Sequence, residues 1–363
     1  MANNLAANTP IKFSLKLVEL LYNETCYTKI TNTDYEGQIK NEGDRVRVRT
    51  LGKLTLNAYT KGMTLVAEDL TPTDEDLIID QQFYFKFIVD DIDKLQNDIN
   101  TIDAYAAIAK RDMSTLLDTD ILAYMRKNVS FANALGTSYS TGTVAVDAAG
   151  TVTGTSTVVT AAMVGGYFKA TGHTAAFIIA TRASNTSFTL VNQDGSAYSG
   201  GVITAGAAYV INAATAVSIT KSNIYSKIVS LRTALGVSLT PKEGRFLVVN
   251  SEFEGVLLQA PEFIPAVGVA YEDAVKGAKI GRIAGFDVYT SELVNGDNTT
   301  GYWFIAGTRD YCALAIQIMK VNTLDSSQDP TTFTSTVKGL LVWGRKVFDG
   351  NRGRGAVLRA TLS

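Results

Sequence analysis

The amino-acid sequence predicts an α+β fold that carries an inserted all-β domain, and three observations support this. Apolar and polar residues alternate over 45–50 and 83–89, the period-two pattern of β-strands. From Ile92 to Tyr124 apolar residues recur every three or four positions, which is typical of one long amphipathic helix. Between Gly136 and about Ala216 the chain is rich in Gly, Thr, Ser, Ala and Val and nearly free of Lys, Glu and Arg.

Composition limits the classes of protein. The chain has 363 residues, of which 46% are hydrophobic and 19% charged, so two domains or one domain with an insertion are expected. A net charge of -2 and a pI near 5.6 argue against a generally basic nucleic-acid binder. Cys26 and Cys312 lie far apart and are interpreted as buried apolar residues. Without a signal peptide or a bilayer-spanning apolar run, we expect no membrane partner and use in a cytoplasm.

Residues 1–35 are predicted to form a polar N-terminal arm with one apolar patch. The alternation of Ile11, Phe13 and Leu15 favours a strand, whereas Leu17, Leu20 and Leu21 suit a docked helix. The Asn and Thr residues on both sides of this patch indicate a segment that orders only against a partner.

Residues 36–90 are predicted to be an extended loop with charged limbs. Alternation places Val46 and Val48 on one face of a strand and three arginines on the other. The arginines face the acids of the return limb either within one hairpin or between neighbouring subunits. Exposed pairs contribute little each, but a repeated lattice of them fixes register and specificity. The predicted inter-subunit contacts are Arg45, Arg47, Arg49, Glu68, Asp69, Asp74, Glu75 and Asp76.

A long helix is predicted to begin at Asp90 or Asp91, either of which is a good N-cap. At about 1.5 Å per residue it would be roughly 50 Å long. Asp118 and Asp120 leave open whether the helix continues through them. In the Gly/Thr-rich block, turn signals such as Gly165-Gly166 and Asp194-Gly195 separate short β-type runs, which predicts a compact barrel or sandwich.

Mixed α and β patterns follow Asn223. They predict helices at 224–235, 251–258 and 309–317 and strands at 245–250, 285–290, 302–306, 338–343, 346–348 and 356–362. Gly236 and Ser251 are the expected stop of the first helix and cap of the second.

Residues with catalytic potential are sparse. The only histidine, His173, lies among Gly and Thr residues, and without a second histidine a His-dependent triad or a His-Cys-Cys zinc site is hard to assemble. The acids at 69–76 lack the order of a calcium loop and are interpreted as a partner-facing strip. We therefore expect no enzyme, no cofactor and no metal.

The run Gly350–Gly355 is interpreted as a turn between strands, where Arg352 and Arg354 could contact nucleic-acid phosphate or a neighbour's acids.

Three stretches and the order of the elements carry a family resemblance. The stretches are 83–93, which enters the long helix, 280–289 and 333–347. In this order the chain resembles the major capsid proteins of tailed bacteriophages, with the Hong Kong ninety-seven type shell fold. The regions that the resemblance implies are an N-terminal arm (1–35), an extended loop (36–90), a peripheral domain with spine helix (91–135), an insertion domain (136–216), an axial domain (217–319) and peripheral strands (320–363).

The resemblance implies a function that no motif shows by itself. It implies a structural protein that assembles with itself into pentamers and hexamers of an icosahedral head around double-stranded DNA. It also implies a portal, non-specific contact with DNA, a place in the virion and assembly in the host cytoplasm. Because the extended loop begins near residue 36, a separate scaffolding protein is expected.

Two alternatives remain at this point. One is the shell subunit of a bacterial nanocompartment, which shares the fold. The other is a surface-binding module carried by 136–216, which would need exposed aromatic residues. Most of the available aromatic residues occupy strand positions suited to a core; they are Tyr139, Tyr167, Phe168, Phe177, Phe188, Tyr198 and Tyr209.

Overall fold

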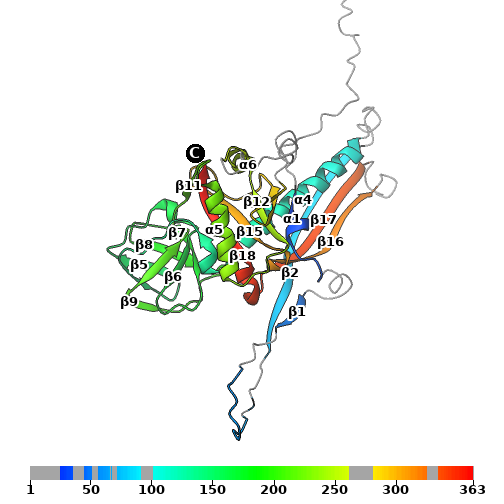
Figure 1. The fold of residues 1–363 in the computed structure, drawn as a ribbon. Helices are drawn as coiled ribbons and strands as arrows, with labels where there is room; N and C mark the ends of the chain where they lie inside the picture. Colours follow the sequence, from blue (N-terminus) through cyan, green and yellow to red (C-terminus); the bar gives the residue numbers. More distant parts are fainter. Residues whose placement is uncertain are drawn as a thin grey trace, which may run out of the picture.

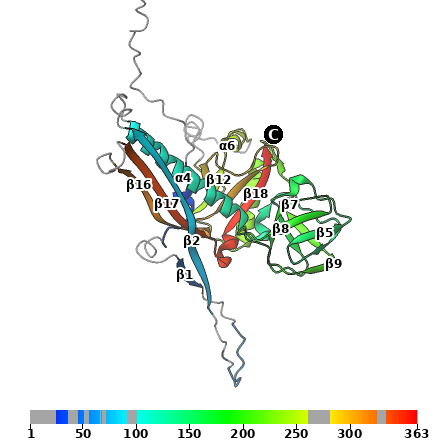
Figure 2. The same ribbon diagram turned by 180° about the vertical axis from the view of Figure 1, so that it is seen from behind.

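The computed structural model describes residues 25–35, 45–50, 56–65, 67, 72–90, 101–260, 281–324 and 334–362. Three sheets and the helices between them make up an α+β fold. Figure 1 shows a long helix lying along long strands, a central sheet with shorter helices, and a rounded β-domain at the opposite end. A thin hairpin projects from the body, and the reverse view in Figure 2 shows the same separation.

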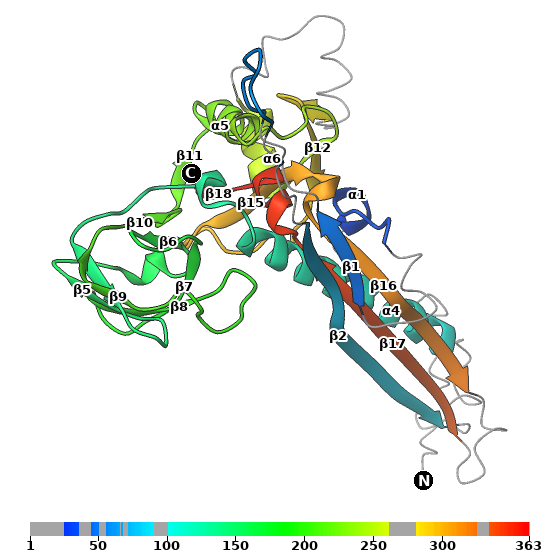
Figure 3. The same ribbon diagram turned by 90° about the horizontal axis from the view of Figure 1, so that it is seen from below.

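The long sheet has four antiparallel strands, which lie side by side in Figure 3. Their order is β1 (Arg45–Thr50), β2 (Thr73–Asp90), β17 (Thr334–Lys346) and β16 (Ala313–Leu324). The acids from Asp74 to Asp80 and the alternating residues 83–89 lie on one continuous strand, β2, of 18 residues. The first residues of β2 pair with β1, and residues 79–90 pair with β17 from Thr334 to Gly344, so β2 joins the hairpin to the body.

Helix α4 (Thr101–Lys127) lies along this sheet and is continuous through its acidic residues. Asp120 accepts hydrogen bonds from Trp343 Nε1 at 3.0 Å and from Arg345 at 2.8 Å. Buried Asp118 instead accepts the backbone N–H of Cys26 at 3.3 Å, just before the short helix α1 (Tyr27–Ile30). These acids therefore anchor the helix rather than break it. The predicted helix start at Asp90 or Asp91 concerns residues 91–100, which lie outside the described residues.

The central sheet is assembled from distant parts of the chain. Its order is β11 (Val217–Ile219), β18 (Gly355–Leu362), β15 (Tyr302–Thr308), β12 (Arg245–Val249), β14 (Phe286–Thr290) and β13 (Arg282–Ile283), and β3 (Ala134–Leu135) also pairs with β18. Helices α5 (Ile224–Val237) and α6 (Ser251–Leu258) pack on it. The segment 320–363 thus divides between two sheets, since β17 pairs in the long sheet and β18 in the central one.

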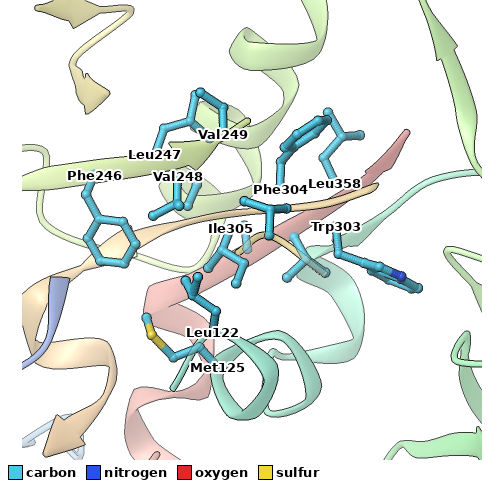
Figure 4. Close-up of a cluster of buried hydrophobic side chains, with 14 of the residues drawn as sticks. Leu122, Met125, Phe246, Leu247, Val248, Val249, Trp303, Phe304, Ile305 and Leu358 are labelled. Atoms are coloured by element: carbon cyan, nitrogen blue, oxygen red, sulfur yellow. The ribbon is translucent and has the colours of Figure 1, made fainter. Parts of the chain in front are cut away.

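The main core lies between the central sheet and α4. Strand β12 is buried at every position because both faces of the sheet are covered. Figure 4 shows Leu122 and Met125 of α4 beneath the sheet, while Phe304 and Leu358 point to the other side. Burial of each such side chain contributes about 1.5–3 kcal/mol, so this layer holds helix and sheet together.

The segment predicted to be an insertion domain (136–216), which keeps that name below, contains one seven-stranded sheet. Its order is β10 (Tyr209–Asn212), β6 (Tyr167–Ala170), β7 (Phe177–Arg182), β8 (Ser187–Val191), β5 (Thr151–Thr155), β4 (Thr143–Val146) and β9 (Ile203–Ala207). The edge strands β9 and β10 are joined through Ala208 alone, so the sheet curls back on itself at that corner. A core that includes Phe168, Phe188 and Tyr209 fills its inside.

Several local predictions differ from the structure. The predicted helix at 309–317 is wrong: the short 3-10 turn η4 (Arg309–Tyr311) leads directly into β16, which pairs with β17. Pairing with a distant strand overrides the local preference of an apolar run that is ambiguous by itself. Helix α5 passes through Gly236, and α6 is capped by Asn250, whose side chain accepts the Phe253 N–H at 3.0 Å. The predicted strands at 338–343 and 346–348 are not separate: one strand, β17, runs from Thr334 to Lys346, and residues 347–348 lie outside it.

Candidate functional site: the projecting hairpin

The base of the hairpin is held to the body by apolar packing. Val46 and Val48 of β1 point to one face, as the alternation predicts, and Leu77 and Ile79 of β2 join them. Leu77 is fully buried. This face packs against Ala313 and Ala315 of β16, Val342 of β17, Phe348 and Tyr35. The hairpin therefore leaves the body at a fixed position.

The other face of the hairpin carries a ladder of ion pairs. Arg47 lies directly opposite Asp76 and Arg49 opposite Asp74. Each guanidinium donates two hydrogen bonds to its carboxylate, from Nε at 2.8 Å and from Nη2 at 3.2 Å. Arg45 lies 3.8 Å from Asp76. Of the two arrangements that the sequence leaves open, the structure shows the one in which these charges pair within the chain.

The ladder changes the acid–base properties of its members. The hydrogen bonds from Arg49 and Arg47 hold the pKa of Asp74 and of Asp76 below the usual range. The two carboxylates therefore stay ionised at mildly acidic pH, and the hairpin keeps its charges there. Glu75 accepts the backbone N–H of Asp349 at 3.1 Å, which ties β2 to the turn after β17. The predicted contacts Glu68 and Asp69 lie outside the described residues.

The tip of the hairpin, residues 56–65, exposes apolar side chains. Leu56 is 96% exposed and Leu65 is 76% exposed, and Tyr59 and Met63 are also exposed. The tip reverses at Gly62, whose φ of +90° suits glycine, and Met63 N–H donates to Thr60 O at 3.0 Å. Figures 1 and 2 show the tip far from the rest of the body. Clustered apolar side chains on so small a projection indicate a surface that a partner covers.

A second apolar surface lies where α4 meets β2. A cavity of about 340 Å³ opens there between aromatic residues of β2 and the 108–116 stretch of α4. Phe83 stacks on Trp343 with ring centroids 5.4 Å apart. Gly339 lies beneath Phe85, where any Cβ would be only 2.1 Å from the ring. On the opposite face of the sheet Tyr84 is 83% exposed and lies next to Leu340.

The predicted contact residues Arg352 and Arg354 both have partners in the chain. They lie in the 3-10 turn η6 (Asp349–Arg354), which connects β17 to β18. Arg352 donates to Asp349 at 2.9 Å and to the side chain of Gln193. Arg354 donates to Asp310 at 3.0 Å. Their charges are thus partly neutralised inside the subunit.

The aromatic residues of the insertion domain offer no exposed platform for a sugar. Of the seven candidates, Tyr139 is partly buried and the other six are buried. His173 is 6% exposed and packs among Phe168, Phe177 and Tyr198. His173 Nε2 lies 2.7 Å from the Tyr198 hydroxyl, which also lies within hydrogen-bond distance of Gly201 O, and His173 Nδ1 is buried without a hydrogen-bond partner. Burial lowers the pKa of His173.

The described residues also bear on metal and membrane chemistry. Cys26 and Cys312 are buried free thiols, and burial raises the pKa of both. In the described part of the chain no three His, Cys, Asp or Glu side chains gather where they could hold a metal ion. No helix in that part is both long and apolar enough to cross a membrane.

Comparison with known proteins gives the family. A family model described as phage capsid protein matches residues 170–358, more than half of the chain. The chain belongs to the phage capsid protein family. No curated protein matches this chain.

Solved structures show the same fold. A protein of Mycobacterium phage Che8 superposes with a TM-score of 0.65 at 19% identity, covering 96% of each chain. The capsid structure of cyanophage P-SCSP1u gives 0.61 at 10% identity, covering 100% of this chain and 96% of the other. The capsid of Ralstonia phage GP4 gives 0.53 at 14% identity, covering 97% and 95%.

These findings confirm the resemblance to tailed-phage major capsid proteins and the Hong Kong ninety-seven type α+β fold. The phage capsid protein is a structural component of the virion and not an enzyme. The match to a phage family gives the nanocompartment alternative no support.

Proposed function

We propose that this phage capsid protein assembles with copies of itself into hexamers and pentamers of an icosahedral head that encloses double-stranded DNA. The hairpin supports this proposal most directly. Its base is anchored by Leu77, its limbs are stiffened by the ladder, and its tip exposes Leu56 and Leu65 away from the body. A tip so placed can cover its apolar side chains only on another molecule.

Assembly follows from the asymmetry of this contact. A hairpin that docks on a different surface of the next copy makes a heterologous contact, and such contacts generate closed rings. Subunits joined in this way bury obligate-sized interfaces, on the order of 2,000–5,000 Å². Many contacts made together then stabilise a shell that no single contact would hold.

The ladder is proposed to take part in these interfaces. The Arg45, Arg47 and Arg49 side chains remain more than half exposed after pairing with their own acids, and Asp74 and Asp76 retain exposed surface. A neighbouring subunit can therefore form ion pairs with these exposed charges, and such complementarity contributes more to specificity than to affinity. Glu75, which lies opposite Val48 on the other face of the hairpin, and Glu68 and Asp69, which lie outside the described residues, are proposed as further contacts.

The remaining partners are inferred from the family. A separate scaffolding protein and a portal would direct assembly in the host cytoplasm, and packaged DNA would touch the shell without sequence preference. Arg352 and Arg354 stay candidates for contact with phosphate or with a neighbour, although Asp349 and Asp310 already pair with them. The region boundaries predicted from the sequence are part of the same proposal.

Electron microscopy of the purified full-length protein tests the proposal. We expect uniform closed particles from the wild type, and only unassembled subunits from the double variant Leu56→Ser, Leu65→Ser, because the tip loses its apolar contact. Val202→Ser is the matched control, since Val202 is an exposed apolar residue on the insertion domain, and it should assemble normally. A wild-type protein that stays monomeric under all conditions would overturn the assembly proposal. Normal particles from the double variant would overturn the role of the tip.

A further inference from the structure

The C-terminal end of helix α4 has its backbone carbonyls satisfied in an unusual way. The last carbonyls of any helix lack partners within the helix. Here the Tyr167 hydroxyl donates to Arg126 O. Just beyond the helix, Gln193 Nε2 donates to Val129 O at 2.7 Å and Asn212 Nδ2 donates to Phe131 O at 2.9 Å. All three donors are side chains of the insertion domain.

The insertion domain also contributes apolar side chains to the body. Strands β6 and β7 are paired, with Tyr167 opposite Ile178 and Phe168 opposite Phe177. Phe168 and Phe177 point into the domain's own core, whereas Tyr167 and Ile178 belong to the main core of the body. Tyr167 is fully buried and meets Trp303 edge-on, with centroids 6.2 Å apart. The β6–β7 pair is therefore buried on both faces.

Two arginines complete the junction around Trp303. The guanidinium carbons of Arg126 and Arg359 lie 4.2 and 4.8 Å from the centroid of the indole ring. Arg359 Nη1 also donates to Ala213 O at 3.2 Å and Ala214 O at 3.0 Å, where the chain leaves the insertion domain. Burial and the nearby Arg126 lower the pKa of Arg359 to about 10. The exit of the domain is thus fixed to the central sheet as well as to α4.

We infer that the insertion domain is an integral cap of helix α4 and that the two open and close together as one cooperative unit. A domain tethered only by its linkers could tilt freely. Tilting this one would leave the carbonyls of Arg126, Val129 and Phe131 without donors and would expose Tyr167. Detachment is disfavoured because it loses these three hydrogen bonds and the burial of Tyr167 together. This inference concerns the single chain and does not depend on shell assembly.

Hydrogen–deuterium exchange of the full-length protein, read by mass spectrometry, tests the coupling. Tyr167→Phe removes only the hydroxyl that caps Arg126 O and keeps the ring in place. We expect exchange to rise about tenfold in residues 124–133 as well as in the insertion domain, the effect of losing one buried hydrogen bond. Tyr209→Phe is the companion variant, because the Tyr209 hydroxyl donates to Thr141 O inside the insertion domain and not to the α4 region.

Because the two regions open together, Tyr209→Phe should raise exchange in 124–133 as well as within 136–216. A rise confined to 136–216 would overturn the inference. The inference would be overturned if Tyr167→Phe changed only the insertion domain, or if it left exchange unchanged everywhere. It would also be overturned if the wild-type insertion domain exchanged in a separate step while 124–133 stayed protected.

Discussion

The projecting hairpin and the insertion domain are both β-structures, yet they bury their side chains in opposite ways. The insertion domain packs Phe168 inside itself and Tyr167 against the body, so both faces of one strand pair are covered. Among its described residues the hairpin buries apolar side chains at its base, as at Leu77, and leaves Leu56 and Leu65 exposed at its tip. One region covers its apolar side chains within the single chain, and the other leaves exposed the side chains that we propose a partner covers.

This difference separates two kinds of mutational effect. Changes in the insertion domain should act on the free energy of unfolding of the isolated subunit, because its contacts are internal. Changes on the hairpin beyond its base should act on assembly and leave unfolding nearly unchanged. A hairpin-tip substitution that lowers the free energy of unfolding, or an insertion-domain substitution that blocks assembly without lowering it, would contradict this division.

The largest effect is expected from Phe168→Ala. Phe168 is fully buried, stacks on Tyr209 at 5.5 Å and meets Phe188 edge-on at 5.7 Å. Truncation leaves a cavity that should cost about 3–5 kcal/mol in the free energy of unfolding. Chemical denaturation of the unassembled subunit measures this. Val210→Ala, on the partly exposed face of β10, is the control and should change it by less than about 0.5 kcal/mol; equal losses would contradict the prediction.

A smaller effect is expected from lowering the pH through the range in which histidine titrates. Burial lowers the pKa of His173 in the folded state, so protonation favours the unfolded chain, where the ordinary value near 6.5 applies. Stability should therefore fall as the pH drops below about 6.5 and level off once the pH passes the folded-state pKa. His173 is the only histidine, so His173→Gln should remove this slope between pH 7 and pH 5.5. Parallel pH profiles for the two proteins would refute the assignment.

The smallest effect on stability is expected at the ladder, where the informative readout is assembly. Arg49→Asp breaks the pair with Asp74, and adding Asp74→Arg restores an ion pair of reversed polarity. Neither change should shift the denaturation midpoint, because exposed pairs contribute little. We expect both variants to assemble poorly, since a neighbour reads the polarity. If electron microscopy shows normal particles from the double variant, the Arg49–Asp74 pair contributes to its own hairpin and not to assembly.

Local patterns predicted much of the fold. Alternation in β1 correctly placed Val46 inward and the arginines outward, and the apolar stripe of α4 predicted a long helix. The docking of the insertion domain was missed, although a signal was present. Tyr167-Phe168 and Phe177-Ile178 are consecutive apolar residues, which is typical of strands buried on both faces.

The sequence by itself determined the periodicities, the low density of catalytic groups and the sharp compositional boundary near Gly136. Only the tertiary structure decided the partners. The pairing of Arg47 with Asp76, the bond from Gln193 to Val129 O and the conversion of 313–317 into a strand all join segments far apart along the chain. Register between distant segments depends on how whole apolar faces pack, and no local pattern contains that information.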